Sequence, residues 1–197
     1  MNRIECLNSL ARLREQALVI VSPGYAGHEL CAAQHDEGTI YNMDMPYSSP
    51  MCLGLAMAAP TQRVIAIEGD GSMLMALGSL TTIGRYRPPN LTVLVFDNRT
   101  YLTTGDGAVA TAGVDFAALA RSARIPNAFA VENLDAFSNV IGKALSEPGP
   151  WFIAAQVDVS DRGDPRARAP FPGDLVEQAI LFQRKLRERG IAAFGGH

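Results

Sequence analysis

The sequence lacks the cysteine spacing that builds disulfide frameworks or metal clusters. It has three cysteines in 197 residues, Cys6, Cys31 and Cys52, and no two of them form a CxxC pair. Disulfide frameworks, zinc sites and iron–sulfur clusters need paired or more closely spaced cysteines. The spacing therefore argues against these classes and fits a reducing compartment, so we expect a cytoplasmic protein.

The sequence also has no excess of positive charge and no long apolar run. Its formal net charge is −3, which leaves no electrostatic footprint for nucleic acid or for an anionic membrane. No apolar run approaches the roughly 18 residues of a membrane-spanning helix. The first residues carry charges within their apolar pattern and no small-residue cleavage site, unlike a signal peptide. We expect neither a nucleic-acid nor a membrane partner.

What the sequence does contain is a regular alternation of strand and helix patterns. Hydrophobic residues make up 48% of the chain, and its length suits one domain with a sizeable core. Continuous apolar runs, typical of parallel strands buried on both faces, occur at 17–21, 39–44, 63–68, 91–97, 128–132 and 151–159. Helical patterns occur at 3–15, 27–34, 50–59, 72–86, 114–125, 135–147 and 175–189. We predict one doubly wound α/β domain over 1–197, with about six parallel strands and helices on both faces.

The stretch VIAIEGDGSMLM, at 64–75, ends an apolar strand in an aspartate between two glycines. Asp70 follows the strand at 63–68, and Asn98 follows the strand at 91–97. Because a right-handed crossover joins these strands, both side chains leave the sheet at the same edge, where such sheets bind ligands. GDG alone is also typical of an ordinary tight turn, but the strand before it, the helix after it and the later asparagine favour a binding site.

The helix after this aspartate opens with Gly71 and Ser72, and the N-terminus of a helix is a ready site for anions. Asp70 would repel a phosphate there unless a cation lay between the two negative groups. One carboxylate, one amide and phosphate oxygens form a donor set that suits Mg²⁺. The sequence therefore predicts a metal–diphosphate site. It does not fit the dinucleotide fingerprint, because Leu74 stands where GxGxxG requires its third glycine.

The stretch GDGSMLMALGSLTTIGRYRPPNLTVLVFDN, continued by RTYLTTG, resembles the diphosphate-binding domain of thiamine diphosphate (ThDP) enzymes. In that family GDG is followed, at the end of the next strand, by an asparagine. The amino-acid sequence of this stretch is similar in particular to the sulfopyruvate and phosphonopyruvate decarboxylases. The similarity extends to MCLGLA at 51–56 and to VEQAILFQRKL near the C-terminus. The resemblance implies ThDP and Mg²⁺ as cofactors and the decarboxylation of a 2-oxo acid to an aldehyde.

The resemblance also implies roles for individual residues. Mg²⁺ would be bound by Asp70, Asn98 and the carbonyl of Thr100. Met45 would be the apolar wedge under the cofactor, with core packing as the alternative, and Met43 would offer its carbonyl to the 4′-amino group. The residues implied in cofactor binding are Gly24, Tyr25, Met43, Met45, Gly69, Gly71, Ser72, Asn98 and Tyr101. Those implied in substrate binding are His28 and Thr104.

The chain departs from the family pattern at two places. Met43 and Asp44 stand at the Gly and Ser positions of a frequent Gly-Ser-Met, which a backbone carbonyl tolerates. His28 stands where close relatives often have arginine, whose fork suits a sulfonate or phosphonate, so the resemblance leaves an anionic substrate open. A helix-capping or surface histidine is the alternative interpretation. The stretch 160–174, with arginines among prolines, is predicted to be a solvated loop; the alternative is that it closes over the site or contacts a partner.

The length of the chain leaves room for only one of the two domains that form a ThDP active site. In the family the other domain supplies the glutamate that protonates the aminopyrimidine ring. The resemblance therefore implies a separate pyrimidine-binding subunit that carries this glutamate, in an α2β2 or larger hetero-oligomer. Two alternatives stay open: a ThDP-dependent carboligase of the acetolactate synthase type, and a non-catalytic scaffold subunit with the same fold.

Overall fold

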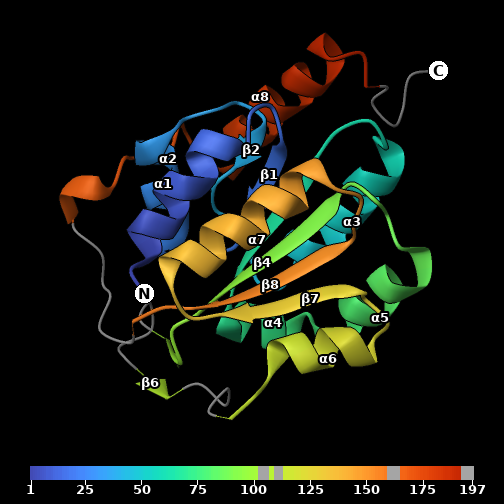
Figure 1. The fold of residues 1–197 in the computed structure, drawn as a ribbon. Coiled ribbons are helices and arrows are strands. Elements are labelled where there is room, and N and C mark those ends of the chain that lie inside the picture. The colour runs from blue at the N-terminus through green and yellow to red at the C-terminus, as the bar shows by residue number, and fades with distance from the viewer. Residues whose placement is uncertain (102–106, 109–112, 159–164, 192–197) are drawn as a thin grey trace.

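A computed structural model describes residues 1–101, 107–108, 113–158 and 165–191. Six parallel strands form one sheet in the order β2-β1-β3-β4-β8-β7, shown edge-on between helices in Figure 1. The strands are β1 (Leu18–Val21), β2 (Thr39–Ile40), β3 (Val64–Gly69), β4 (Leu91–Asp97), β7 (Asn127–Val131) and β8 (Trp151–Gln156). The predicted doubly wound α/β fold with six parallel strands is confirmed.

Helices cover both faces of this sheet. They are α1 (Arg3–Leu13), α2 (Tyr25–Ala33), α3 (Ser48–Ala58), α4 (Asp70–Met75), α5 (Leu77–Tyr86), α6 (Phe116–Ser122), α7 (Leu134–Ser146) and α8 (Leu175–Glu188). A hairpin of β5 (Thr100–Tyr101) and β6 (Gly107–Ala108) and the 3-10 turn η2 (Pro165–Ala167) complete the described elements. No helix among the described residues is both long and apolar enough to cross a membrane.

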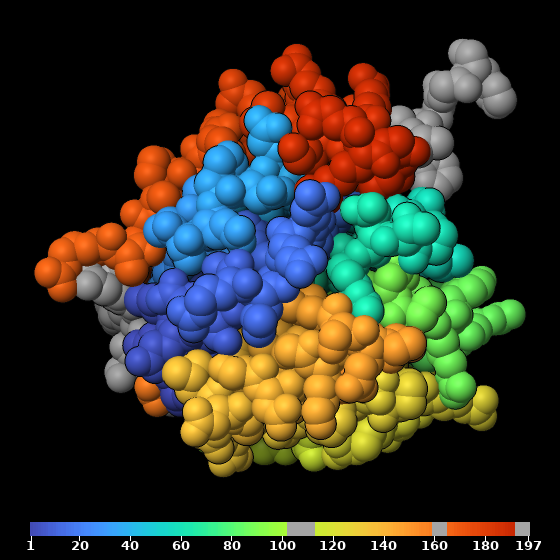
Figure 2. Space-filling model, turned by 45° about the horizontal axis from the view of Figure 1, so that its top comes forward, coloured from blue at the N-terminus to red at the C-terminus, as the bar shows by residue number. Residues whose placement is uncertain are grey.

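Alternate residues of each strand face two separate hydrophobic clusters. Ile65 and Ile67 of β3 pack with α1 and α7, which lie side by side in Figure 2. Val64 and Ala66 of the same strand pack with α3, α5 and α6 on the other face. This period of two explains the continuous apolar runs of the central strands, because most of their residues are buried on one face or the other.

Several predicted elements differ from the structure in length. The helix expected at 72–86 is broken into α4 and α5 at Ala76, whose backbone leaves the helical region (φ −93°, ψ 6°). The strand expected at 39–44 ends at Ile40, because the next backbone N–H, that of Tyr41, donates to the side chain of Gln178 on α8 at 2.8 Å. The last strand ends at Gln156 rather than at 159.

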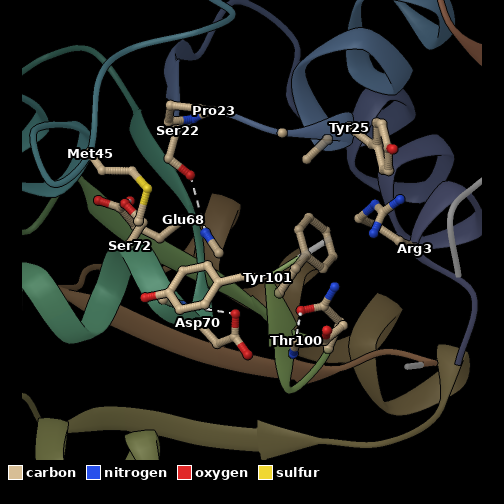
Figure 3. A pocket seen from close by; sticks show the side chains of 16 residues that line it. Arg3, Ser22, Pro23, Tyr25, Met45, Glu68, Asp70, Ser72, Thr100 and Tyr101 are labelled. Carbon is tan, nitrogen blue, oxygen red and sulfur yellow. Dashed lines mark hydrogen bonds between the residues drawn. The ribbon is translucent and has the colours of Figure 1, made fainter. Parts of the chain in front are cut away.

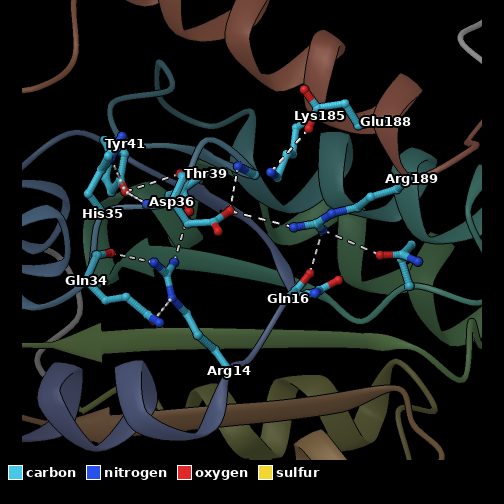
Figure 4. Close-up of polar contacts among 12 residues, drawn as sticks. Arg14, Gln16, Gln34, His35, Asp36, Thr39, Tyr41, Lys185, Glu188 and Arg189 are labelled. Carbon is cyan, nitrogen blue, oxygen red and sulfur yellow. Dashed lines mark hydrogen bonds and ion pairs between the residues drawn. The ribbon is translucent and has the colours of Figure 1, made fainter.

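Buried and partly buried arginines fix the edge of the sheet at β2 (Figure 4). Arg14, after α1, donates to the side chain of Gln34 at 2.7 Å and to the hydroxyl of Thr39 at 2.9 Å. Arg189, after α8, donates to the carbonyl of Gln16 at 2.6 Å and lies 3.8 Å from a carboxylate oxygen of Asp36. These contacts hold α8 against β2 from a distant part of the chain.

A close contact between α5 and the turn after α6 gives a test of the fold. A Cβ atom on Gly84 would overlap the backbone carbonyl of Ala123, which cannot rotate away. We expect Gly84→Ala to lower the free energy of unfolding by about 1–3 kcal/mol, as measured by urea unfolding. Gly78→Ala on the same helix has open space around its Cβ and should be neutral or stabilising by up to about 1 kcal/mol. Equal effects of the two substitutions would contradict this packing.

Candidate functional site

The carboxyl ends of β3 and β4 lie together at one edge of the sheet. The two strands pair in parallel register, from Val64 opposite Leu91 to Gly69 opposite Phe96. Asp70, which is 3% exposed, begins α4 directly after β3. Its Oδ1 accepts the N–H of Gly71 at 2.8 Å and its Oδ2 accepts the N–H of Arg99 at 2.8 Å. One carboxylate thus joins the ends of both strands.

A pocket at this edge collects most of the residues that the sequence singled out (Figure 3). Asp70 and Asn98 both line it, as expected from the order of the strands. The other predicted residues that line it are Gly24, Tyr25, Met45, Gly69, Gly71, Ser72, Thr100 and Tyr101. The structure thus brings together residues from four separate stretches of the chain.

Two of the predicted residues that the structure describes do not line this pocket. Met43 is buried in the core, where its N–H donates to the carbonyl of Val21 at 2.8 Å. His28 lies on α2 in a neighbouring pocket. Thr104 lies outside the described residues.

Glu68 is a site residue that the sequence analysis did not single out. It is 1% exposed. Its Oε1 accepts the N–H of Ser49 at 2.8 Å and the hydroxyl of Ser49 at 2.7 Å, and its Oε2 accepts the hydroxyl of Ser72 at 2.6 Å. Burial raises the pKa of Glu68, and the serine hydrogen bonds partly offset that rise. The available signal was a charged residue at the end of the apolar run VIAIE.

The β5 hairpin covers the beginning of α4. In Figure 3 the ring of Tyr101 stands over this turn, and a Cβ atom on Gly71 would overlap that ring. Glycine at 71 therefore permits the close approach of Tyr101. The hydroxyl of Ser72 is engaged with Glu68, so the polar groups that this turn offers to a ligand are mainly those of its backbone.

The donor set at the strand ends fits a magnesium ion bound together with a diphosphate. No three His, Cys, Asp or Glu side chains gather into a metal-binding group in the part of the chain that the structure describes. Asp70 and Asn98 offer one carboxylate and one amide, which are hard oxygen ligands. A metal ion at this edge would need further oxygens from a ligand, and phosphate oxygens are the partners that Mg²⁺ commonly takes.

The buried Glu68 gives a prediction for pH dependence. Its raised pKa means that the folded protein binds this proton more tightly than the unfolded chain does. The free energy of unfolding contributed by this group therefore falls as pH rises above the unfolded pKa. Glu68→Gln has no such proton, so its stability relative to wild type should increase between about pH 4 and pH 7. Urea unfolding without Mg²⁺ measures this, and a difference independent of pH would contradict the raised pKa.

Comparisons with known proteins agree with the geometry of the site. A family model described as "Thiamine pyrophosphate enzyme, C-terminal TPP binding domain" matches residues 28–155, and thiamine pyrophosphate (TPP) is the same compound as ThDP. A solved structure of a thiamine diphosphate-dependent 4-hydroxybenzoylformate decarboxylase from Rhodococcus jostii RHA1 has a TM-score of 0.69. It is 20% identical, covers 82% of this chain and 33% of its own, and supports the fold alone.

Two curated relatives are more similar in sequence. Sulfopyruvate decarboxylase subunit beta of Methanothermobacter thermautotrophicus is 35% identical over 160 residues, which cover 80% of this chain and 82% of the relative. Phosphonopyruvate decarboxylase of Streptomyces viridochromogenes is 34% identical over 145 residues, which cover 73% of this chain but only 36% of the relative. The resemblance inferred from GDG and the later DN is confirmed. The chain therefore belongs to the thiamine pyrophosphate enzymes and carries their C-terminal TPP binding domain.

Proposed function

We propose that this chain is one subunit of a ThDP- and Mg²⁺-dependent decarboxylase that converts a small 2-oxo acid to an aldehyde and CO₂. The substrate class is that of 3-sulfopyruvate or phosphonopyruvate. The observation that carries the proposal is the buried carboxylate of Asp70 at the joined ends of β3 and β4. It stands in a chain similar over most of its length to proteins named decarboxylases of these substrates.

The residues of this chain bind and orient the cofactor. Asp70, Asn98 and the carbonyl of Thr100 would hold Mg²⁺, whose charge would offset that of a diphosphate beside the buried carboxylate. The diphosphate would be held on one side by the backbone of Gly69, Gly71 and Ser72. Gly24 and Tyr25 would contact its other side, and Tyr101 would cover it. Met45 would support the cofactor from below. The carbonyl of Met43 would accept a hydrogen bond from the 4′-amino group of the cofactor. When bound, ThDP supplies the electron sink for the loss of CO₂.

A partner subunit completes the site. The chain needs a pyrimidine-binding subunit that supplies the activating glutamate, in an α2β2 or larger hetero-oligomer. The name "subunit beta" of the relative supports this arrangement. Exposed apolar side chains on two helices of one sheet face also support it: Met51 and Met57 on α3 and Met75 on α4 are 41%, 50% and 58% exposed. These helices begin beside Met45 and Asp70, so a subunit seated on them lies next to the cofactor pocket.

The cofactor proposal is tested by calorimetric titration of ThDP with Mg²⁺, into the chain alone and mixed with a pyrimidine-binding chain from the same genome. We expect binding to require Mg²⁺ and Asp70→Ala to weaken it by at least about 100-fold, because even indirect partners of a metal ligand change affinity by 10–100-fold. The control is Asp135→Asn, which removes an exposed carboxylate in the first turn of α7, outside the pocket lining. Absence of magnesium-dependent binding in both conditions would contradict the proposal and favour the scaffold alternative.

The reaction proposal is tested by product analysis with the reconstituted complex. We expect sulfopyruvate to give sulfoacetaldehyde and CO₂, with less than about 1% of that rate for the chain alone, since a catalytic group that acts in every turnover contributes on the order of 100-fold or more. A carboligation product instead of an aldehyde would favour the acetolactate synthase type. Full activity of the chain alone would contradict the need for a partner.

The partner surface has its own test. We expect Met75→Glu to weaken the complex by at least about tenfold, because a charge placed in an apolar interface loses its hydration. Size-exclusion chromatography with light scattering measures the complex. Leu13→Glu is the matched control, since Leu13 is 41% exposed at the end of α1, on the opposite face of the sheet. An equal effect of both variants would contradict the assignment of this surface.

A further inference from the structure

A second pocket adjoins the cofactor pocket and shares Pro23, Gly24 and Tyr25 with it. The remaining lining comes from His28 on α2, from Asn42 after β2, and from the segment 168–171 between η2 and α8. The sequence analysis predicted a solvated loop at 160–174. The segment 168–171 is a loop as predicted, but residues 168, 169 and 171 are partly buried against α2 rather than fully solvated.

His28 holds this segment in place. The carbonyl of His28 accepts the N–H of Ala169 at 3.1 Å, and Nδ1 of its ring lies 2.9 Å from the carbonyl oxygen of Ala169. Because a carbonyl only accepts, Nδ1 carries the hydrogen in this contact. The ring of Phe171 stacks on the imidazole with centroids 3.8 Å apart. These contacts fix the position of Arg168, which directly precedes Ala169 in the chain.

Arg168 lines the second pocket and brings a positive charge against Tyr25, which lines both pockets. Its guanidinium carbon lies 3.7 Å from the centroid of the Tyr25 ring, within the range of a cation–π contact. Its Nε is buried and has no hydrogen-bond partner among the residues that the structure describes. A buried donor on a charged group is costly unless something accepts from it.

A second guanidinium near the Tyr25 ring, that of Arg3, differs from Arg168 because it is paired with a carboxylate. Arg3 lies 5.9 Å from the centroid of Tyr25, and its Nε and Nη2 donate to the two carboxylate oxygens of Glu29 at 2.7 Å and 2.9 Å. The charge of Arg3 is therefore matched by a buried carboxylate. Within the described ranges of the chain, no carboxylate forms an ion pair with Arg168.

We propose that Arg168, with Asn42 and His28 beside it, binds the distal anionic group of the substrate: a sulfonate, a phosphonate or a second carboxylate. This inference rests on the proposed function, because it assigns the part of the 2-oxo acid remote from the reacting carbon. A guanidinium binds such a group through two parallel N–H donors. His28 lines the same pocket as Arg168 and bonds to Ala169, so it anchors the segment that delivers Arg168 to this pocket.

The experiment measures binding of sulfoacetate, which has the anionic group but no 2-oxo group to react, to the purified chain by NMR titration. We expect Arg168→Gln to weaken sulfoacetate binding by roughly tenfold to hundredfold, the usual effect of losing charge-assisted hydrogen bonds. Arg168→Lys keeps the positive charge but loses the forked pair of N–H donors, so its affinity for sulfoacetate should lie between those of wild type and Arg168→Gln. Arg85→Gln removes the same charge from another arginine-lined pocket, beside Arg87 and Arg124, and should change nothing.

Two further readouts separate this inference from the proposed function. Titration of Mg²⁺ with ThDP should give the same affinity for wild type and Arg168→Gln, because the anion belongs to the substrate. If the variant weakens cofactor binding instead, Arg168 binds the diphosphate and the inference is overturned. No binding of sulfoacetate to wild type, or equal binding to wild type and Arg168→Gln, also overturns it, while magnesium-dependent ThDP binding would leave the cofactor proposal intact.

Discussion

The parallel pairing of β3 with β4 is the constraint on which the site depends. It ends both strands at the same level, so that the residues after them, Asp70 and Asn98, reach one pocket. The bonds from Asp70 to the N–H groups of Gly71 and Arg99 then lock the two turns to each other. A shift of this register by one residue would reverse the faces of every side chain on the strand and separate the ligands.

A second carboxylate, that of Glu68 near the end of β3, holds the surrounding helices. Glu68 ties the beginning of α3, through Ser49, to the beginning of α4, through Ser72. Burying this group is costly, which is why its pKa is raised, and three hydrogen bonds offset part of the cost. The cleft therefore has a rigid floor built from β3, while its other wall comes from the loop before α2.

The sequence predicted what local patterns encode. Buried strands, the GDG turn and the later asparagine follow from period, composition and the order of strands, and these placed Asp70 and Asn98 correctly at one edge. It could not predict where tertiary contacts intervene. β2 is short because Gln178, far along the chain, takes the N–H of Tyr41. The segment at 168–171 looks like a loop by composition. It is held by contacts with His28, which bonds to Ala169 and stacks on Phe171.

The double contact between His28 and Ala169 links two positions that are 141 residues apart in sequence. A relative with arginine at position 28 lacks the imidazole that bonds and stacks with this segment, so it must hold the segment by other means. Selection would then act on the pair rather than on either residue alone. Position 28 and the segment 168–171 therefore form one unit, in which a change of the imidazole also changes how Arg168 is held.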